Sequence, residues 1–459
     1  MGNKNNINRR DFLKRLGMGG VALMGASVLK PIETIAKTTL EEDIKPIANK
    51  MMTYRINHNT NDRVSLLGFG MMRLPSENKV IKQEEVNHLV DIAIANGVNY
   101  FDTAPVYHGR KSEQATGIAL SKHSRKDFYV ATKLSNFSPE SKTTEGAKKM
   151  YYDSFKNLQV DVIDYYLLHS IGGGGENEIK ERFLDNGILD FLIEERKKGK
   201  IRNLGFSYHG DVKIFDYMLS LHNKYHWDFV QIQMNYVDWR HASITKNEWG
   251  GTPDADAEYL YNKLTQMNIP VVIMEPLRGG RLANLPEDIA KELKAERPQS
   301  SLASWAFRWC GSYPNVLTAL SGMTYLRDLE DNVRTYSPLE SCTSKENTLL
   351  ERIADKIEGY PTIPCTQCNY CMPCPFGVNI PGNFAYYNDK IDKRIIPLPD
   401  KSEKDYNSRV TEFQNGFYKA LKQEETAMKC RDCGICLAKC PQKIRIPNQL
   451  NRIKEILNS

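Results

Sequence analysis

The sequence of 459 residues lacks several features that would assign it at once to a class. No run approaches the roughly 18 uncharged apolar residues that a spanning helix needs, so we do not expect a polytopic membrane protein. No cysteine precedes Cys310, which excludes a lipid on a cysteine near the N-terminus. The net charge is +6, but residues 1–40 hold seven Lys/Arg against two acidic residues, which places +5 there. The remainder has no basic stripe, and we expect no nucleic-acid partner.

The N-terminal residues have the order of a twin-arginine export signal. Arg9 and Arg10 open the motif Arg-Arg-Asp-Phe-Leu-Lys, and a weakly apolar, Gly-rich stretch follows from Leu16 to Leu29. A basic tail with a chance arginine pair is the alternative, but charge block, motif and apolar run occur in the order that export requires. We expect residues 1–40 to direct the protein to the periplasm or the outer face of the cytoplasmic membrane. No Ala-x-Ala site stands out, so cleavage stays open.

From about Arg63 to Thr335, short β-branched or apolar runs alternate with helical stretches. This rhythm is typical of repeated βα units around a parallel sheet. Eight such runs favour a closed (β/α)8 TIM barrel, an α/β fold, over an open doubly wound sheet. The predicted strands are Val64–Phe69, Val98–Asp102, Phe128–Thr132, Val162–Leu168, Asn203–Phe206, Phe229–Gln233, Val271–Met274 and Leu317–Leu320.

The chain is long enough for a barrel and a smaller second part. We place the barrel at residues 60–338, a linker or helical bridge at 339–364 and a cysteine-rich domain at 365–459, because the βα rhythm stops after Pro338. The segment Gly172–Gly175 comes after the fourth strand without the Lys or Ser/Thr of a phosphate loop. We interpret it as a flexible linker.

Eight of the ten cysteines form two quartets near the C-terminus, a spacing typical of metal binding and not of a disulfide framework. Each quartet ends in Cys-Pro, and the tails after the two quartets match each other, which implies two similar half-sites. Three thiolates two residues apart can surround three corners of a cubane, while the fourth, fixed by proline, points away. Structural zinc is the alternative, but zinc takes two well-separated pairs. The quartets are Cys365, Cys368, Cys371 and Cys374, and Cys430, Cys433, Cys436 and Cys440.

The quartets resemble those of bacterial two-cluster ferredoxins. The resemblance implies two [4Fe-4S] clusters in a small ferredoxin-like domain, where the fourth cysteine of each run ligates the other cluster. Cys440 would then complete the first cluster and Cys374 the second. The first run departs from the pattern, because its last gap is two residues and not three. The remaining cysteines, Cys310 and Cys342, are interpreted as a core thiol and an incidental residue.

Four residues with catalytic potential stand at the ends of consecutive predicted strands. Asp102, Lys133 and His169 each close a strand, and Tyr107 lies in the loop after the second, where barrel enzymes keep their chemistry. Their surroundings resemble the active site of the aldo/keto reductase family over roughly Arg63 to Asn332. The resemblance implies an enzyme that interconverts an alcohol and a carbonyl. The segments that carry it are Phe101–Glu113, Ala131–Lys133, Leu167–His169, Gly205–Ser207 and Gln231–Tyr236.

The resemblance also implies a role for each of the four. Tyr107 would donate the proton, and the Lys133 ammonium would lower the pKa of its phenol from the usual value near ~10. Asp102 would hold Lys133 in place, and His169 would donate a hydrogen bond to the substrate carbonyl. Singly, each residue has an ordinary structural explanation. Their joint occurrence at the strand ends favours the catalytic one.

A nicotinamide dinucleotide, NAD(P), is a further implication of the family. Ser207 and Gln233 would bind its carboxamide, and Met274 stands where the family often has a stacking aromatic. Gly322 and Asp328 stand where members that prefer the 2′-phosphate have basic residues, which favours NAD over NADP. The expected contacts are Ser207, Gln233, Met274, Leu277, Gly279, Gly322, Asp331 and Asn332.

Two functions fit these features. The first is an exported oxidoreductase whose two clusters relay electrons to a redox partner protein or a quinone-linked system, since diffusible NAD(H) is not recycled outside the cytoplasm. The second is a catalytically silent barrel that serves as scaffold for an electron-transfer module. The substrate would be a small carbonyl or alcohol, and a mixed aromatic and polar rim fits sugars, cyclitols, quinones or steroids equally. The expected rim residues are Tyr208, His209, Trp239 and Arg73.

Overall fold

The computed structural model describes most of the chain beyond its N-terminal region. The predicted export signal, residues 1–40, lies outside the described residues. Contacts divide the chain into two units, Met1–Lys45 and Pro46–Ser459, and the barrel and the cysteine module both belong to the second. Within the described part of this unit, no helix is long and apolar enough to cross a membrane. The described residues are 46–48, 51–173, 175–242, 256–359, 362–393, 395–396 and 405–459.

Eight parallel strands close into a barrel in the order β10-β11-β12-β3-β6-β7-β8-β9, which confirms the predicted (β/α)8 fold. Its interior is filled by large apolar side chains such as Tyr165, Phe229 and Val272, so the barrel is a packed core. The strands are β3 (Leu67–Gly70), β6 (Tyr100–Asp102), β7 (Tyr129–Leu134), β8 (Ile163–Ile171), β9 (Ile201–Tyr208), β10 (Phe229–Gln233), β11 (Val271–Met274) and β12 (Val316–Ser321).

The first predicted strand, Val64–Phe69, is wrong in its extent. The chain divides at Leu66 into β2 (Asp62–Ser65), which pairs with β1 (Tyr54–Asn57), and β3 of the barrel. At Leu66 the chain passes from the hairpin to the barrel. The Leu66 N–H donates to the carbonyl of Thr53, just before β1, at 2.8 Å, and the Leu66 carbonyl accepts from Ala319 in β12 at 2.8 Å. The hairpin is anchored at the amino ends of the strands, where the Tyr165 hydroxyl donates to buried Asp62 at 3.0 Å.

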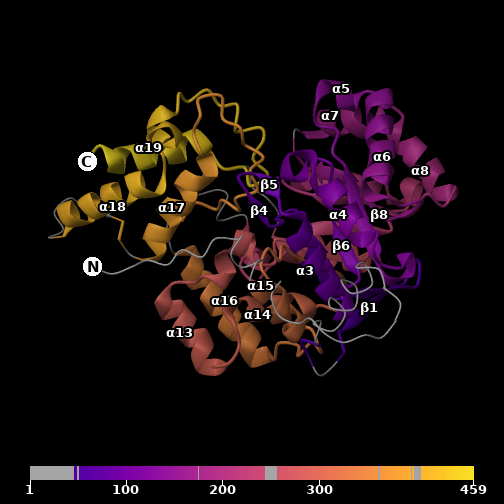
Figure 1. Cartoon of the computed structure of the whole chain (residues 1–459), viewed down its shortest axis with the longest axis horizontal. Helices are drawn as coiled ribbons and strands as arrows, with labels where there is room; N and C mark the ends of the chain where they lie inside the picture. The colour runs from indigo at the N-terminus through magenta and orange to yellow at the C-terminus, as the bar shows by residue number, and fades with distance from the viewer. Residues whose placement is uncertain are drawn as a thin grey trace, which may run out of the picture. The chain divides into compact units, whose positions relative to one another are not determined.

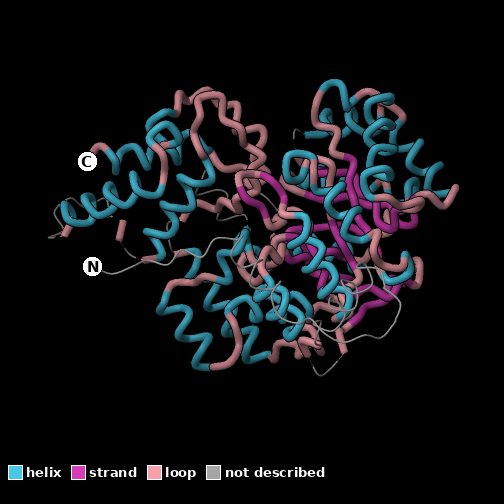
Figure 2. Tube along the Cα trace, in the orientation of Figure 1, coloured by secondary structure: helices cyan, strands magenta, loops and turns pink. Residues whose placement is uncertain are grey.

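Helices surround the barrel and bury one apolar face each, as α3 does with Val86, Leu89 and Ala93 (Figures 1 and 2). The longer ones are α3 (Gln83–Ala95), α4 (Ser112–Leu120), α6 (Thr144–Leu158), α8 (Ile188–Lys197), α9 (Val212–Ser220), α12 (Ala257–Gln266), α13 (Glu287–Glu296), α14 (Leu302–Gly311) and α15 (Leu326–Thr335). The shorter ones are η1 (Tyr107–Arg110), η2 (Arg125–Asp127), α5 (Pro139–Lys142), α7 (Gly175–Ile179), η3 (Lys180–Leu184), α10 (His222–Tyr225) and η4 (Arg278–Ala283).

The predicted bridge is a single helix, α16 (Ser344–Glu358). Its Glu346 forms a two-pronged ion pair with Arg308 of α14, with 2.9 Å for each bond, and both side chains are buried. Because an Arg–carboxylate pair in this geometry is directional as well as strong, it fixes α16 to the helix layer of the barrel. The bridge is therefore part of the barrel's surface.

Three helices and the cysteine loops form the described part of the C-terminal module, which Figure 1 shows in orange and yellow on the side away from α6 and α8. Phe384, Phe413, Phe417 and Ile453 make its apolar core, and the cysteines pack on the edge of that core. The helices are α17 (Ile380–Asp392), α18 (Tyr406–Ala420) and α19 (Ile446–Leu457), with the short turns η5 (Gln423–Glu425) and η6 (Ala427–Lys429) before the second quartet.

The glycines after β8 are more constrained than a flexible linker. Gly172 has φ +107°, and a Cβ there would lie 2.5 Å from the carbonyl oxygen of His209. Gly175 already belongs to helix α7. The linker interpretation is therefore wrong for Gly172, where close contact between two barrel loops requires a residue without a side chain.

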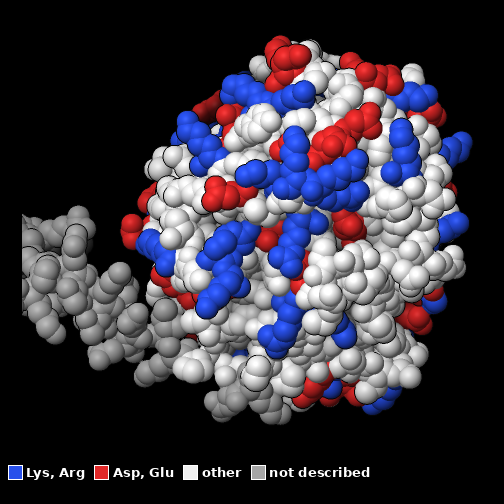
Figure 3. Space-filling model, turned by 90° about the vertical axis from the view of Figure 1, so that its right-hand side faces the viewer, with Lys and Arg blue, Asp and Glu red and all other residues white. Residues whose placement is uncertain are grey.

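Charges are mixed on the barrel side that carries α6 and α8. Figure 3 shows Lys and Arg side chains near the middle of this face, with Asp and Glu beside and between them. Several are paired within their helix, such as Lys149 with Asp153 at 2.5 Å and Lys197 with Glu194 at 2.7 Å. Exposed pairs of this kind contribute little to stability. They do neutralise the basic side chains locally.

Candidate active site and cluster sites

The four predicted catalytic residues come together at the carboxyl end of the barrel. Asp102 closes β6, Lys133 lies in β7, His169 lies in β8 and Tyr107 begins η1, just after β6. None is more than 9% exposed. Parallel strands end at the same rim of a barrel, so residues far apart in the sequence meet there.

Lys133 and Asp102 form a buried ion pair. The Lys133 ammonium donates to a carboxylate oxygen of Asp102 at 2.5 Å and to the carbonyl of Thr103 at 2.7 Å. Burial raises the pKa of Asp102 and lowers the pKa of Lys133, and each partner opposes the shift of the other. Both charges persist because each compensates the other's lost hydration.

Tyr107 lies beside this pair, and its hydroxyl is a protonated acid. The Lys133 nitrogen is 5.2 Å from the centre of the Tyr107 ring. Burial raises the pKa of Tyr107 well above its usual value, and Tyr370 and Asp102 raise it further. The expected net lowering by Lys133 is not found, because burial is the largest effect on the phenol and the Asp102 carboxylate, paired with Lys133, raises its pKa. Tyr107 is thus arranged to give a proton and not to exist as a phenolate.

His169 is held as a neutral ring. Its Nδ1 is 2.6 Å from the Ser135 hydroxyl, and its ring lies 5.8 Å from that of Tyr107 at 84°. Burial lowers its pKa well below the usual value, and the charges of Lys133 and Arg182 lower it further. A neutral imidazole that accepts from Ser135 at Nδ1 carries its proton on Nε2. That nitrogen is 3.3 Å from the Tyr370 hydroxyl.

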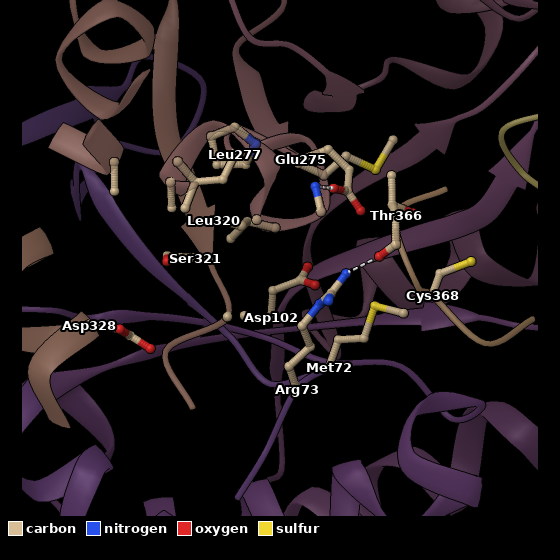
Figure 4. Close-up of a pocket in the computed structure, with 18 of the residues that line it drawn as sticks. Met72, Arg73, Asp102, Glu275, Leu277, Leu320, Ser321, Asp328, Thr366 and Cys368 are labelled. Atoms are coloured by element: carbon tan, nitrogen blue, oxygen red, sulfur yellow. Dashed lines mark hydrogen bonds between the residues drawn. The ribbon is translucent and has the colours of Figure 1, made fainter. Parts of the chain in front are cut away.

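A cavity opens above these residues and, with its mouth, encloses ≈ 1550 Å³. Asp102 and Tyr107 line its floor, and Cys368 of the first quartet lines the same cavity. In Figure 4, Asp102 lies between Cys368 and Met72 on one side and Ser321 and Asp328 on the other. Two of the four predicted catalytic residues and one predicted cluster ligand therefore line one cavity, while Lys133 and His169 lie outside its lining.

Most of the predicted nicotinamide contacts lie along this cavity. Gly322 and Asp331 line it near Arg327, a basic residue that the sequence interpretation missed. The open groove and its glycines fit the phosphate and adenosine portion of a dinucleotide. The predicted contacts that line the cavity are Met274, Leu277, Gly279, Gly322, Asp331 and Asn332.

The two predicted carboxamide ligands are not part of the lining. The Ser207 hydroxyl accepts from the Ser170 N–H at 2.9 Å. The Gln233 amide donates to Asp238 at 2.6 Å, and its oxygen accepts from Gln442 of the cysteine module at 3.0 Å. Both side chains are thus hydrogen-bonded to other protein groups and not to a carboxamide.

Two of the four predicted rim residues, Arg73 and His209, line the cavity. Tyr208 and Trp239 do not, and that prediction is wrong. Tyr208 is buried against Phe215, with ring centres 5.0 Å apart, because it faces the helix layer at the end of β9. Trp239 is buried in an aromatic cluster 5.4 Å from Trp309.

The cysteines group across the two runs, as crossover ligation requires. A second cavity of ≈ 320 Å³, mouth included, is lined by Cys440 together with the first three cysteines of the first run. Its other walls are mainly apolar, among them Ile380 and Phe384, with the polar residues Thr366, Asn369 and Gln442. Burial raises the pKa of Cys368 to about 11, and the Cys440 thiol adds to the rise. Four crowded thiols in an apolar cavity fit an iron–sulfur cluster, whose iron favours the thiolates.

The second group has the reciprocal composition. Burial raises the pKa of Cys436 to about 11, and the thiols of Cys430, Cys433 and Cys374 raise it further. Cys374 is thus close enough to affect Cys436, as the predicted exchange requires. Cys310 is fully buried in the barrel, as predicted for a core thiol, while Cys342 is half-buried.

Both cysteine runs contact the catalytic rim, through residues that the sequence interpretation missed. Tyr370 meets His169, Gln442 meets Gln233, and the Thr366 carbonyl accepts from Arg73 at 2.5 Å. Figure 4 shows the last contact beside Cys368. All three residues stand within two positions of a ligand cysteine. That proximity was their only signal in the sequence.

Lys133→Met should destabilise the barrel, because it leaves the Asp102 carboxylate buried and unpaired, at about 3–5 kcal/mol. For a domain of this size we expect the melting temperature to fall by roughly 10 °C. Asp102→Asn combined with Lys133→Met should recover most of the loss. Exposed Lys149→Met is the control, and a wild-type melting curve for Lys133→Met would contradict the pairing.

Crossover ligation predicts that Cys440→Ala damages the first cluster and Cys374→Ala the second. In electron paramagnetic resonance of the anaerobically purified protein, Cys440→Ala should resemble Cys368→Ala, and Cys374→Ala should resemble Cys433→Ala. Cys342→Ala should keep the iron content of the unmodified protein, about eight per chain. Resemblance of Cys440→Ala to Cys433→Ala would show that each run holds its own cluster.

Comparison with known proteins agrees with both halves of the structure. Residues 66–354 match the aldo/keto reductase family, and residues 364–444 match a 4Fe-4S dicluster domain. The L-galactose dehydrogenase of Arabidopsis thaliana is 26% identical over 310 residues, which cover 64% of this chain and 91% of the relative. The uncharacterized oxidoreductase YqkF of Bacillus subtilis (strain 168) is 25% identical over 305 residues, 59% of this chain and 87% of that protein.

Among solved structures, the holo form of the aldo-keto reductase AKR11C1 from Bacillus halodurans aligns with a TM-score of 0.52 and 24% identity, over 66% of this chain and 96% of its own. At this identity the likeness concerns the fold. The family match spans more than half of the chain and includes all eight barrel strands. The protein is therefore an aldo/keto reductase-like oxidoreductase of the aldo/keto reductase family, with a C-terminal 4Fe-4S dicluster domain.

Proposed function

We propose that this protein interconverts an alcohol and a carbonyl at the Tyr107 site and exchanges the electrons through its cysteine module. One observation supports this above all: Cys368, a predicted cluster ligand, lines the same cavity as Asp102 and Tyr107. A module that served only as an attached electron carrier would have no reason to contact the barrel at its catalytic rim.

The four predicted catalytic residues have separate roles at the reacting carbon. Tyr107, protonated because it is buried, gives its proton to the carbonyl oxygen during reduction and recovers it during alcohol oxidation. His169, neutral at Nε2–H, donates to the same oxygen and orients it. Lys133 and Asp102 hold a fixed charge pair beside the phenol and keep water out.

Two kinds of cofactor fit the proposal. A dinucleotide along Leu277, Gly279, Gly322, Asp331 and Asn332 would supply hydride exchange. Clusters held by the two quartets would supply electron transfer in single steps. Asp328 beside the groove favours NAD over NADP, although the neighbouring Arg327 is basic. Alcohol oxidation releases two electrons and two protons, which matches two sites that each take one electron.

The proposal also includes export of the protein from the cytoplasm. We propose that Arg9 and Arg10 direct the folded, cluster-loaded chain to the periplasm or the outer face of the cytoplasmic membrane. Electrons would leave through a redox partner protein or a quinone-linked system, because free nicotinamide is not recycled there.

A silent barrel remains the second candidate, and one observation favours it. The Tyr370 hydroxyl meets His169 Nε2 where a substrate oxygen would bind, and Gln442 binds Gln233 in place of a carboxamide. A barrel that only supports the module could keep both contacts permanently. An active barrel must exchange the first of them for substrate.

Tyr107→Phe tests the active candidate. Because the variant lacks only the transferable proton, we expect kcat for carbonyl reduction or alcohol oxidation to fall at least about 100-fold while the fold and iron content stay unchanged. The holoprotein should be screened with a panel of carbonyls and polyols and an artificial electron acceptor. Exposed Tyr152→Phe is the control. Equal rates in Tyr107→Phe and the unmodified protein would reject the mechanism, and no turnover in any form would favour the silent barrel.

The export proposal has its own test. Replacement of Arg9 and Arg10 by lysine should hold the protein in the cytoplasm, since the twin-arginine route reads the arginine pair. Cell fractionation and immunoblotting would locate it. Lys4→Arg with Lys14→Arg leaves the pair intact and should not change the distribution. Arrival of the Lys-Lys variant in the periplasm in normal amounts would disprove the assignment.

A further inference from the structure

The two halves of the cysteine module are duplicated in backbone as well as in sequence. Gln367 and Asp432 occupy equivalent positions and have φ +55° and +53°, and the next equivalent pair, Asn369 and Gly434, has φ +64° and +74°. The helices after the two runs, α17 and α19, both begin at an Ile-Pro pair. The two halves can therefore be compared position by position.

Three positions around the first predicted cluster contact the barrel: Thr366 and Tyr370 of the first run and Gln442 of the second. All three surround the first predicted cluster, since Gln442 lies two residues after its crossover ligand Cys440. The module and the barrel are in close contact here, because a Cβ on barrel residue Gly279 would lie 2.6 Å from the Thr366 Cα. This face of the module is covered by protein.

The same three positions around the second predicted cluster are Arg431, Ile435 and Phe376. Ile435 is 52% exposed and Phe376 is 44% exposed. Two further apolar residues beside the ligands, Met428 and Leu437, are 40% and 41% exposed. Scattered exposed apolar side chains are ordinary, but four beside the ligands of one cluster form a patch.

The rim of this patch is basic along residues 428–439, while exposed Glu424 lies beside Gly377 on the Phe376 side. Between Met428 and Lys439, the exposed charges are Lys429, Arg431 and Lys439 against the single carboxylate of Asp432. That carboxylate accepts from Asn451 at 3.1 Å and so is partly committed within the module. Cys433, a ligand of the second group, is itself exposed. An apolar centre with a basic rim over an exposed ligand is what an acidic electron carrier would recognise.

We propose that this face, defined by Phe376, Met428, Arg431, Ile435 and Leu437, docks a small acidic electron-transfer protein over the second cluster. The proposal rests on the electron-relay part of the proposed function. Electrons would pass singly: each leaves a reduced cluster, which is thereby oxidised, and reduces one acceptor centre in the partner. The first half of the module would face the substrate cavity and the second half the partner.

The probe is cytochrome c in two forms that share one haem: the native basic protein and the same protein with its lysines succinylated, which makes its surface acidic. The holoprotein is reduced with dithionite, freed of excess reductant and mixed with each ferric form in a stopped-flow instrument. We expect the acidic form to be reduced about tenfold faster at low salt, with the difference lost at high salt.

Variants then test the location. Lys429→Glu with Lys439→Glu should abolish or reverse the tenfold preference, and the uncharged replacement Ile435→Gln should slow the acidic form about tenfold without changing the salt dependence. Lys149→Glu with Lys197→Glu changes the net charge equally on α6 and α8 and should leave the preference intact. Iron content and electron paramagnetic resonance must match the unmodified protein. Since Ile435, Lys429 and Lys439 each adjoin a ligand, the rates of the unmodified protein with the two cytochrome forms at low and high salt decide if the variants lose iron.

Equal rates for the two cytochrome forms, or an unchanged preference in the lysine pair, would overturn the proposal. So would dimerisation through the patch, seen as a sedimenting dimer that Ile435→Gln converts to a monomer, because a second copy would then be the occupant. No substrate enters this experiment. Its failure is therefore distinct from a failure of the Tyr107 chemistry, which the substrate panel tests.

Discussion

The seating of the first cysteine loop on the carboxyl rim of the barrel is the contact on which the rest of this protein's design depends. Three separate bonds hold it, from Thr366 to Arg73, from Tyr370 to His169 and from Gln442 to Gln233. They come from both cysteine runs, because the predicted crossover ligand Cys440 brings its tail back to the first site. Gly279 permits the approach, since any side chain there would meet the Thr366 backbone. A glycine that the family resemblance assigns to a dinucleotide thus also serves the contact with the module.

Burial under this loop also sets the chemistry of the rim. Removal of water raises the pKa of Tyr107 and lowers that of His169, so the phenol stays protonated and the imidazole neutral, with ring centres 5.8 Å apart. The Lys133–Asp102 pair can remain charged there because each partner replaces the other's hydration. The module therefore does more than add electron carriers, since it helps to create the low-polarity site that favours these protonation states.

The sequence predicted what local pattern and spacing determine. All eight strands were placed within a few residues, because alternating βα units leave one closed arrangement, and the positions of Asp102, Tyr107, Lys133 and His169 near one rim followed from the strand ends. The sequence could not show that Tyr208 points toward the helix layer, because a shift of one residue along a strand moves a side chain to the opposite face of the sheet. Tyr370 and Gln442 were missed for another reason. Their contacts join parts of the chain 201 and 209 residues apart, and no local pattern indicates which face of a module meets a neighbour.

The two halves of the module have similar backbone conformations but different surroundings. This difference distinguishes its two predicted cluster sites. Equivalent backbone conformations at the two loops would make two equivalent electron sites in isolation. The barrel breaks that equivalence: it covers one loop with Arg73, His169 and Gln233 and leaves the other, with exposed Ile435 and Phe376, to solvent. Burial and nearby charge are the factors by which a protein tunes a cluster's potential. Two duplicated cysteine loops, of which the barrel covers only one, are therefore sufficient to make the two cluster sites different. One site would face the substrate and the other the partner, although the cysteine ligands are the same.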